Sequence, residues 1–234
     1  MSVELLHYMG DDLMVANAAR VSFNKESAWA DGKPGQVADK DASLINYLAK
    51  HGHWSPFAHP QLQFRIKMPL IIANQWFKHV VGFVRNSVSR RYVSYEPEIF
   101  YPKTFRQSSL QIKQGSLMQE VEKPQECERL FQKTCQNAVK AYNELLASGV
   151  APEQARMVLP QAMYTEFIET ASLQGYARLC QLRLDEHSQK EIRDYAAQIE
   201  KLIYKKFPVS WSALMSCPVA KQIQLASDRA VALQ

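Results

Sequence analysis

The chain has 234 residues, of which 47% are hydrophobic and 22% charged, a composition typical of a globular protein with its own core. The formal net charge of +5 suits an anionic ligand, is small for a nucleic-acid-binding protein and is not gathered into a long basic run. We expect no secretory signal, because the N-terminal Met-Ser-Val-Glu is neither basic nor apolar, and no membrane span, because no stretch approaches roughly 20 apolar residues. A cytoplasmic protein is the simplest expectation.

The four cysteines are spread along the chain without any recognisable pairing. They are Cys127, Cys135, Cys180 and Cys217. None belongs to a Cys-x-x-Cys pair or has the spacing of a metal site, so we expect reduced thiols in a reducing compartment. No base or motif surrounds any of them, and we therefore expect no catalytic cysteine.

The N-terminal part alternates short apolar runs with turn residues. We expect a strand over residues 3–8. Asp11 and Asp12 then open a helix that ends near Ser22. The polar stretch 24–37 contains glycines and a proline, which predicts a loop.

A second helix is expected to have Asp41 as its N-cap and to end before Gly52. Three histidines follow each other closely after this helix. They are His51, His53 and His59. A metal site is one interpretation of this spacing. We prefer structural roles, because Gly52 and Pro56 prevent a helical i, i+4 pair and no Glu lies nearby.

Residues 61–68 alternate between apolar and polar side chains, which predicts a strand with one face in the core. Its apolar members are Leu62, Phe64, Ile66 and Met68. This strand leads directly into a central helix that Pro69 opens and Gly82 ends. The predicted buried positions of that helix, at i, i+4 and i+8, are Ile72, Trp76 and Val80.

Hydrogen-bond donors crowd this central stretch of the chain. Gln75, Lys78 and His79 are three and four positions apart, so a helix would place them on one face. After Gly82 a short segment gathers donor side chains without any acid. These are Arg85, Asn86, Ser87, Ser89, Arg90 and Arg91. A solvated loop is the alternative, but apolar residues flank the segment on both sides. We therefore predict a site for an anionic ligand.

The second half of the chain is predicted to be mainly helical. After an irregular stretch and a polar one over residues 107–116, a long helix runs from Pro124 to Gly149. A short helix over residues 152–159 follows. It carries Arg156 in an apolar run, where the guanidinium needs a partner or a place at the rim, since burying an unpaired charge is costly.

A strand is predicted over residues 163–171, and Ser172 is expected to cap the helix that follows. Ser188 and Glu191 have the spacing of a capping box for the last predicted helix. The apolar stripe of that helix is Ile192, Tyr195, Ala196, Ile199, Leu202 and Ile203. No repeat or linker divides the chain.

Four separated blocks resemble the flavin-dependent thymidylate synthase family. The family signature reads Arg-His-Arg, seven residues, then Ser-x-Arg-Tyr. Here the corresponding segments are Lys78-His79-Val80 and, one residue further along than usual, Ser89-Arg90-Arg91-Tyr92. The other blocks are 51–59, the Arg156 run at 155–160, and 182–192. The last block matches the family's Leu-Arg-x-Asp-x-His-x-Gln-x-Glu-Ile at every fixed position.

The resemblance implies an α+β fold in which helices flank a twisted, mostly antiparallel sheet, over a single domain of residues 1–216. Residues 217–234 form a C-terminal tail of unknown role. Members of the family are homotetramers whose active sites are shared between subunits. In them FAD takes a hydride from NADPH, and methylene-tetrahydrofolate supplies a one-carbon unit to C5 of dUMP. No enzyme cysteine attacks the pyrimidine in that reaction.

The site residues follow from the resemblance position by position. It implies catalytic roles for Ser89, Arg183 and His53. The implied substrate-binding residues are Gln75, Lys78, Ser89, Arg90, Arg91, Arg156 and Arg183. The implied cofactor-binding residues are Ser55, Lys78, His79, Asn86, Ser87, Ser172, Arg178, Leu182 and His187. No metal is implied.

Several positions depart from the family pattern. Ala58 replaces the usual Glu, and Val80 replaces an Arg that contacts flavin. Ser172, Gln174 and Arg178 stand where Asn, Arg and Asn are usual. Ser87 stands in place of an acid, and we expect it either to recruit a water or to leave a nearby arginine short of a partner. The alternative is that the arginines of this segment pair elsewhere.

Two other functions fit parts of the sequence. A nucleic-acid-binding module would use cations beside stacking aromatic side chains. Those residues would be Arg85, Arg90, Arg91, Lys103 and Arg106 with Trp76, Tyr92 and Tyr95. The second alternative is a flavin-binding relative that has lost methyl transfer or acts on another pyrimidine nucleotide.

Overall fold

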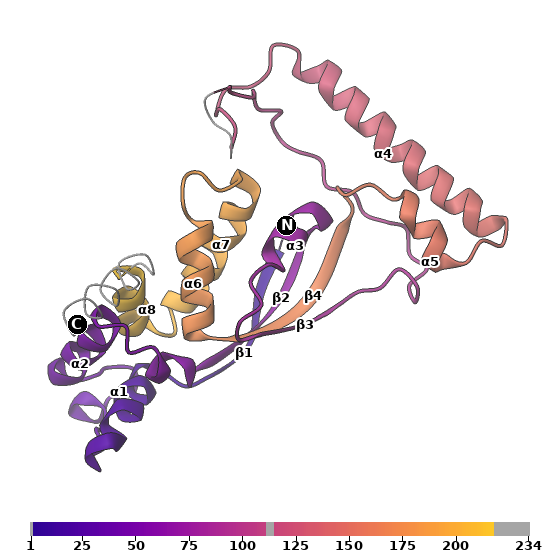
Figure 1. The fold of residues 1–234 in the computed structure, drawn as a ribbon. Helices are drawn as coiled ribbons and strands as arrows, with labels where there is room; N and C mark the ends of the chain where they lie inside the picture. The colour runs from indigo at the N-terminus through magenta and orange to yellow at the C-terminus, as the bar shows by residue number, and fades with distance from the viewer. Residues whose placement is uncertain (1, 111–114, 218–234) are drawn as a thin grey trace, which may run out of the picture.

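A computed structural model describes residues 2–110 and 115–217 (Figure 1). The strands are β1 (Ser2–Met9), β2 (Gln61–Pro69), β3 (Phe83–Ser87) and β4 (Tyr164–Ser172). The α-helices are α1 (Asp12–Arg20), α2 (Asp39–Lys50), α3 (Leu70–Trp76), α4 (Pro124–Ala147), α5 (Pro152–Ala155), α6 (Leu173–Arg183), α7 (Lys190–Tyr204) and α8 (Pro208–Met215). Short 3-10 turns are η1 (Val21–Phe23), η2 (Ala30–Gly32), η3 (Ser55–Ala58) and η4 (Arg156–Val158).

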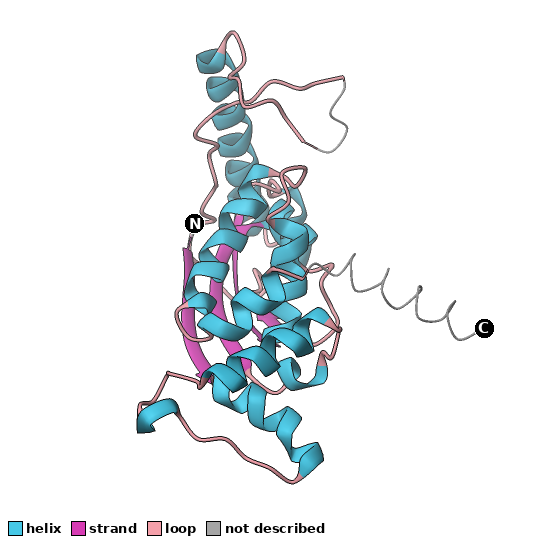
Figure 2. Cartoon of the chain, turned by 90° about the vertical axis from the view of Figure 1, so that its left-hand side faces the viewer, coloured by secondary structure: helices cyan, strands magenta, loops and turns pink. Residues whose placement is uncertain are grey.

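The four strands form one antiparallel sheet in the order β1-β2-β4-β3. The expected alternation in β2 is confirmed, since Leu62, Phe64, Ile66 and Met68 are all fully buried. The helix layer covers this face of the sheet (Figure 2). The fold is therefore α+β with an antiparallel sheet, as expected.

The opposite face of the sheet carries polar and partly exposed side chains. Arg65 of β2 pairs only loosely with Glu4 of β1, at 3.8 Å between Nη1 and Oε2. Val84 of β3 and Ile168 of β4 are apolar but exposed. One face thus holds the core, and the other is open to solvent or to another molecule.

The helices α1, α2 and α8 gather at one end of the sheet, and α4 and α5 extend from the other end (Figure 1). Helix α8 was not predicted from the sequence. Its own N-cap side chain makes no capping bond, and the buried Asp12 of α1 instead accepts from the Val209 and Ser210 amides at 2.9 and 2.8 Å. A distant carboxylate thus satisfies two free N–H groups at the helix start.

Two capping predictions were wrong. Asp41 lies inside α2 rather than before it, and its buried carboxylate accepts from Arg20 and from the Ser27 hydroxyl. Ser188 does not cap α7, because its hydroxyl donates to the Leu182 carbonyl at 2.9 Å, while Glu191 turns to Arg106. In both cases the carboxylate expected to cap the helix pairs with a remote arginine: Asp41 pairs with Arg20, and Glu191 pairs with Arg106.

The central stretch folds differently from the expected single helix. Helix α3 ends at Trp76, so Lys78, His79 and Val80 lie in the turn that follows, and Val80 is 65% exposed instead of buried. Gly82, with φ +79°, completes this turn. Residues 83–87 then form β3 along the edge of β4, a strand that the sequence reading missed.

Other local predictions are confirmed. Ser172 caps α6 by accepting from the Gly175 amide at 3.1 Å, and Asp11 caps α1 by accepting from the Met14 amide at 2.8 Å. No disulfide joins any of the four cysteines, all of which lie among the described residues. Part of the polar stretch 107–116, and the tail after Cys217, lie outside the described residues.

Candidate functional site

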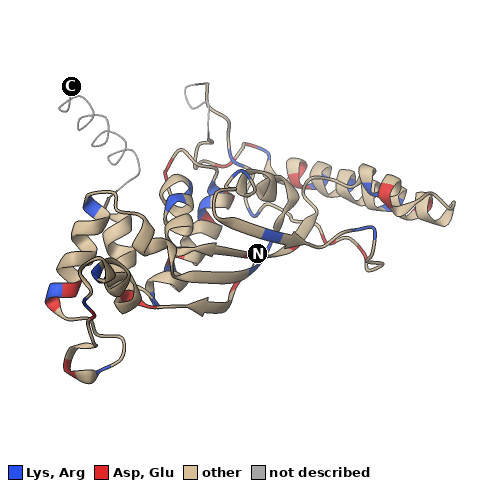
Figure 3. Cartoon of the chain, turned by 60° about the horizontal axis from the view of Figure 1, so that its bottom comes forward, with Lys and Arg blue, Asp and Glu red and all other residues tan. Residues whose placement is uncertain are grey.

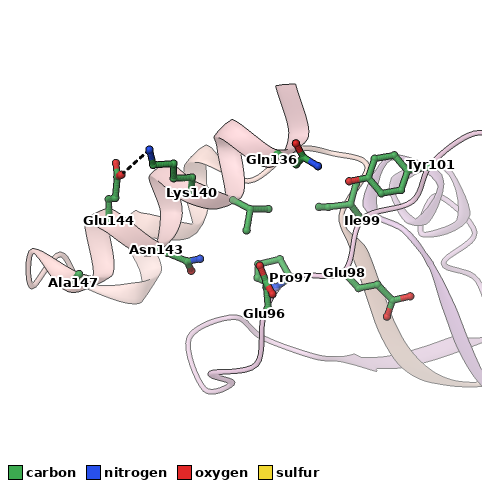
Figure 4. Close-up of a pocket in the computed structure, with 11 residues that line it drawn as sticks. Glu96, Pro97, Glu98, Ile99, Tyr101, Gln136, Lys140, Asn143, Glu144 and Ala147 are labelled. Carbon is green, nitrogen blue, oxygen red and sulfur yellow. Dashed lines mark ion pairs between the residues drawn. The ribbon is translucent and has the colours of Figure 1, made fainter. Parts of the chain in front are cut away.

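One groove among the described residues does not suit an anionic ligand. It measures about 730 Å³ and lies between α4 and the segment 96–101 (Figure 4). Glu96, Glu98 and Glu144 line it, and its one lysine, Lys140, faces Glu144 at 3.7 Å. Figure 3 shows residues of both charges along α4. Six of the predicted site residues instead line two other cavities.

A buried ion pair joins the strands β3 and β4. Glu169 of β4 is fully buried and pairs with Arg85 of β3, which lies directly opposite in the sheet register. The indole Nε1 of Trp76 donates to both carboxylate oxygens at 3.2 and 3.1 Å. Burial raises the pKa of Glu169, and the Arg85 charge acts against that rise.

This pair bears on two expectations about the donor segment. Arg85 is not a free cation for a ligand, because Glu169 neutralises it. The expectation for Ser87 is met only in part: a carboxylate 84 positions away pairs with Arg85 Nε, but Arg85 Nη2 and the Nε and Nη2 of buried Arg90 have no hydrogen-bond partner among the described residues. The sequence reading missed Glu169 because the partner comes from a neighbouring strand and not from the segment itself.

Three side chains that the sequence singled out form one wall. Arg183, at the end of α6, donates from Nε to His79 Nε2 at 2.9 Å and from Nη2 to the Gln75 carbonyl at 3.5 Å. Burial lowers the pKa of His79 to about 4, with further lowering by Arg183, Arg85 and Arg178. His79 is therefore neutral at pH 7, and accepting at Nε2 places its proton on Nδ1. We call Gln75, His79 and Arg183 the inner wall.

The inner wall borders a cavity of about 710 Å³, here called the polar pocket. Gln75 and Arg183 line it from one side, and Leu182 and His187 lie in the same lining. Its further cations are Arg106, Lys190 and Arg193. The structure thus brings together four of the predicted residues around a space with several N–H donors.

A second cavity of about 470 Å³, here called the glycine pocket, lies at the start of α6. It contains the predicted Ser172 and Arg178 together with Gly82 and Gly175. A Cβ at Gly175 would come within 3.3 Å of the Phe83 ring, so glycine is the residue that keeps this wall open without displacing the ring. His53 and Ser55 flank Trp54, which lines the pocket and is 62% exposed.

The remaining predicted residues lie apart from both pockets. Ser89, Arg91 and Arg156 are held only by local contacts: Arg91 Nε reaches Ser89 Oγ at 3.3 Å, and Arg156 Nε reaches the Glu153 carbonyl at 3.4 Å. Arg90 is buried between the rings of Tyr95 and Tyr142, at 4.8 and 5.8 Å. We call residues 89–91 with Arg156 the outer segment.

No hydrogen bond or ion pair among residues 2–110 and 115–217 joins the outer segment to the inner wall. Lys78, in the turn before β3, and Asn86, on β3 itself, are both exposed. One chain thus presents the predicted site in separate parts.

Several residues at these cavities escaped the sequence reading. Trp54 and Gln61 line the glycine pocket, and Arg106 and Gln189 line the polar pocket together with Gln75. Trp54 could have been predicted, because it lies in sequence among three histidines, in a block that resembles the family pattern. The sequence named Arg106 only as a cation of the nucleic-acid alternative, and this residue reaches the polar pocket from a segment remote in sequence.

In the part of the chain that the structure describes, no group of three or more His, Cys, Asp or Glu side chains could hold a metal ion. The ring of His51 packs against Tyr47 at 4.2 Å. In the same part of the chain, none of the helices combines the length and the apolar character needed to span a bilayer.

Residues 4–209 match the family model described as thymidylate synthase complementing protein. A flavin-dependent thymidylate synthase of Thermosipho africanus is 36% identical over 91% of this chain and 90% of its own length. An enzyme of the same name from Thermus thermophilus is 38% identical, covering 90% of this chain and 74% of its own.

Solved structures agree with this match. The UMP/dUMP methylase PolB from Streptomyces cacaoi, bound with 5-Br dUMP, superposes with a TM-score of 0.78 at 28% identity, covering 92% of this chain and 94% of that one. Its complex with 5-Br UMP gives 0.79 at 27% identity, with 92% and 93% covered. Fold, site and relatives together define a methyltransferase. The chain belongs to the flavin-dependent thymidylate synthase family.

Proposed function

We propose that the protein methylates dUMP to dTMP, with FAD as cofactor, methylene-tetrahydrofolate as carbon donor and NADPH as reductant. The observation that carries this proposal is the inner wall, in which Arg183 is oriented by a neutral His79 and by the Gln75 carbonyl beside the polar pocket. A cation held in advance of binding is what an electron-rich pyrimidine requires as C5 becomes nucleophilic.

Each part of the inner wall has a role in this proposal. Arg183 donates to a uracil carbonyl oxygen and stabilises the negative charge that spreads onto it. His79 holds the guanidinium in position, because its unprotonated Nε2 accepts the Nε–H. A protonated His79 would repel Arg183, so its low pKa keeps the arrangement intact at neutral pH.

The glycine pocket and its rim fit a flavin. Trp54 offers an exposed aromatic face, Arg178 a cation, and the backbone at Gly82 and Gly175 permits close approach of a planar ring. When bound, the flavin supplies the reducing equivalents for methyl formation. We assign His53, Ser55, Ser172 and Arg178 to this side of the site, with His79 between the two pockets.

We infer that the outer segment acts on the same nucleotide from a second copy of the chain in a homotetramer. Arg91 and Arg156 are exposed and have only local partners, so their guanidiniums are available to clamp a phosphate in the bidentate way. Exposed apolar side chains at Val84, Ile168 and Met157 fit burial between subunits. The free thiols suit a reducing cytoplasm.

A ribonucleotide substrate is the second candidate. PolB, whose complexes hold both 5-Br dUMP and 5-Br UMP, covers nearly all of this chain. Under this alternative the same wall would act on UMP, and the two nucleotides would differ only in their sugar contacts.

One assay tests both candidates. The purified chain, supplied with FAD, NADPH and methylene-tetrahydrofolate, is incubated with dUMP or UMP, and the mass of the product is measured by mass spectrometry. From dUMP we expect a product in which a methyl group has replaced one hydrogen. A methylated product from UMP alone would support the second candidate, and no product from either would overturn methyl transfer.

A further inference from the structure

A line of hydrogen bonds runs from the polar pocket back to a segment remote in sequence. Gln75 Nε2 donates to Gln189 Oε1 at 2.6 Å, and Gln189 Nε2 donates to Glu191 Oε2 at 2.9 Å. Arg106 closes the line with two bonds to Glu191, at 2.8 and 3.0 Å. We call these four residues the amide relay.

Chemistry fixes the direction of every bond in this relay. Burial raises the pKa of Glu191, but the hydrogen bonds from Arg106 and Gln189 outweigh it and the pKa lies below its usual value. An ionised carboxylate only accepts, so Gln189 must turn its NH₂ toward Glu191 and its oxygen toward Gln75. Gln75 must in turn point its own NH₂ at Gln189. Neither amide can flip without placing two acceptors face to face.

The relay leaves Gln75 Oε1 as an acceptor. This oxygen makes no hydrogen bond to any other residue that the structure describes, and Gln75 lines the polar pocket. Beside it, the Arg183 guanidinium donates to the Gln75 carbonyl from Nη2, while its Nη1 has no partner among the same residues. The wall therefore presents one donor and one acceptor side by side.

We propose that the amide relay makes the polar pocket selective for the uracil edge, with Gln75 Oε1 accepting the N3–H while Arg183 donates to a neighbouring carbonyl. This inference rests on the proposed function and names the base that the site takes. Cytosine carries an unprotonated N3, which would meet Gln75 Oε1 lone pair to lone pair. A site built around a substrate N–H discriminates strongly against an analogue that lacks it.

Glu191→Gln tests the relay with almost no change in shape. The glutamine can donate as well as accept, so both downstream amides become free to turn. Binding of dUMP and dCMP to the FAD-loaded full chain is measured by calorimetry. We expect the wild type to prefer dUMP by about 100-fold or more, and Glu191→Gln to reduce that preference at least tenfold.

Glu4→Gln is the matched control. Glu4 lies on β1, remote from the relay, and forms an exposed ion pair with Arg65 of β2. The variant makes the same chemical change there and should leave the preference for dUMP over dCMP unchanged. Gln75→Met removes the acceptor directly and should weaken dUMP binding about tenfold without weakening dCMP binding. If thermal unfolding shows that Glu191→Gln does not fold, the Gln75→Met variant tests the role of the Gln75 acceptor by itself.

The preference is a ratio of two affinities, so a general loss of stability does not change it. If the wild type methylates dUMP but both Glu191→Gln and Gln75→Met keep its preference for dUMP over dCMP, the role of the relay is overturned and the proposed function is not. A wild type that binds neither dUMP nor UMP overturns the proposed function and the relay together.

Discussion

The inner wall and the outer segment carry the same kinds of side chain in opposite physical states. Gln75, His79 and Arg183 are hydrogen-bonded to each other and to the amide relay, and they rest on the sheet. Arg91 and Arg156 are exposed and held only by bonds within a few residues of themselves. Both regions were predicted from one set of motifs, yet only the first is assembled by a single chain.

The difference separates two ways of building a cation site. Glu169 is linked to the inner wall through Trp76, the chain neighbour of Gln75, and it pairs with Arg85 across β3 and β4. The donors of the inner wall are oriented before any ligand arrives. The outer cations have flexible side chains that a ligand or a second subunit must order, which costs conformational entropy at binding.

Arg85→Ala should lower the folding stability more than any of the other substitutions. It leaves the buried Glu169 without its charge partner, which costs about 3–5 kcal/mol of folding free energy. Arg91→Ala, the matched change in the outer segment, should stay within about 0.5 kcal/mol. Urea unfolding followed by circular dichroism measures both variants. Equal losses in the two would mean that the ion pair does not support the inner wall.

His79 should give the inner wall a pH dependence. Its folded pKa of about 4 is below the ordinary 6.5, so the unfolded chain binds more protons between these values. Stability is therefore complete above pH 6.5 and falls as the pH is lowered toward 4.

We expect the fall to be about 1–2 kcal/mol, allowing for the part of the imidazole that water reaches. His79→Gln should remove this part of the slope, and Arg91→Gln should not. Unfolding free energies at a series of pH values from neutral down toward the folded pKa make the measurement. A His79→Gln slope identical to that of the wild type would show that His79 titrates normally.

Ser87→Glu should have the smallest effect. Ser87 is exposed at the end of β3, and the arginine it was expected to need, Arg85, already pairs with Glu169. We predict a change in stability within about 0.5 kcal/mol, measured by the same urea unfolding. A gain of more than about 1 kcal/mol would show that an acid is missing at this position after all.

Much of the fold was readable from local pattern. The period of two in β2, the Ser172 cap and the long helix ending before Gly149 depend on neighbours in sequence, and all three are present. The errors arose where remote residues decide. Asp41 binds Arg20 instead of capping a helix, and Asp12 caps α8 from another element.

The candidate site followed the same rule. The family motifs identified the residues of the inner wall, but not the carboxylate beneath Arg85 or the order of donors and acceptors behind Gln75. Those depend on the register of β3 against β4 and on Arg106 reaching Glu191 across 85 positions. No pattern within a single segment contains that information.

Mixing two inactive variants tests most directly the claim that the two regions meet across a subunit boundary. Arg183→Ala removes the inner cation, and Arg91→Ala combined with Arg156→Ala removes the outer ones. Each protein alone should lose nearly all dUMP methylation. After the two are unfolded together and refolded, random pairing should restore roughly a quarter of wild-type activity, because some sites combine an intact wall with an intact outer segment. A mixture no more active than the sum of its components would contradict the account.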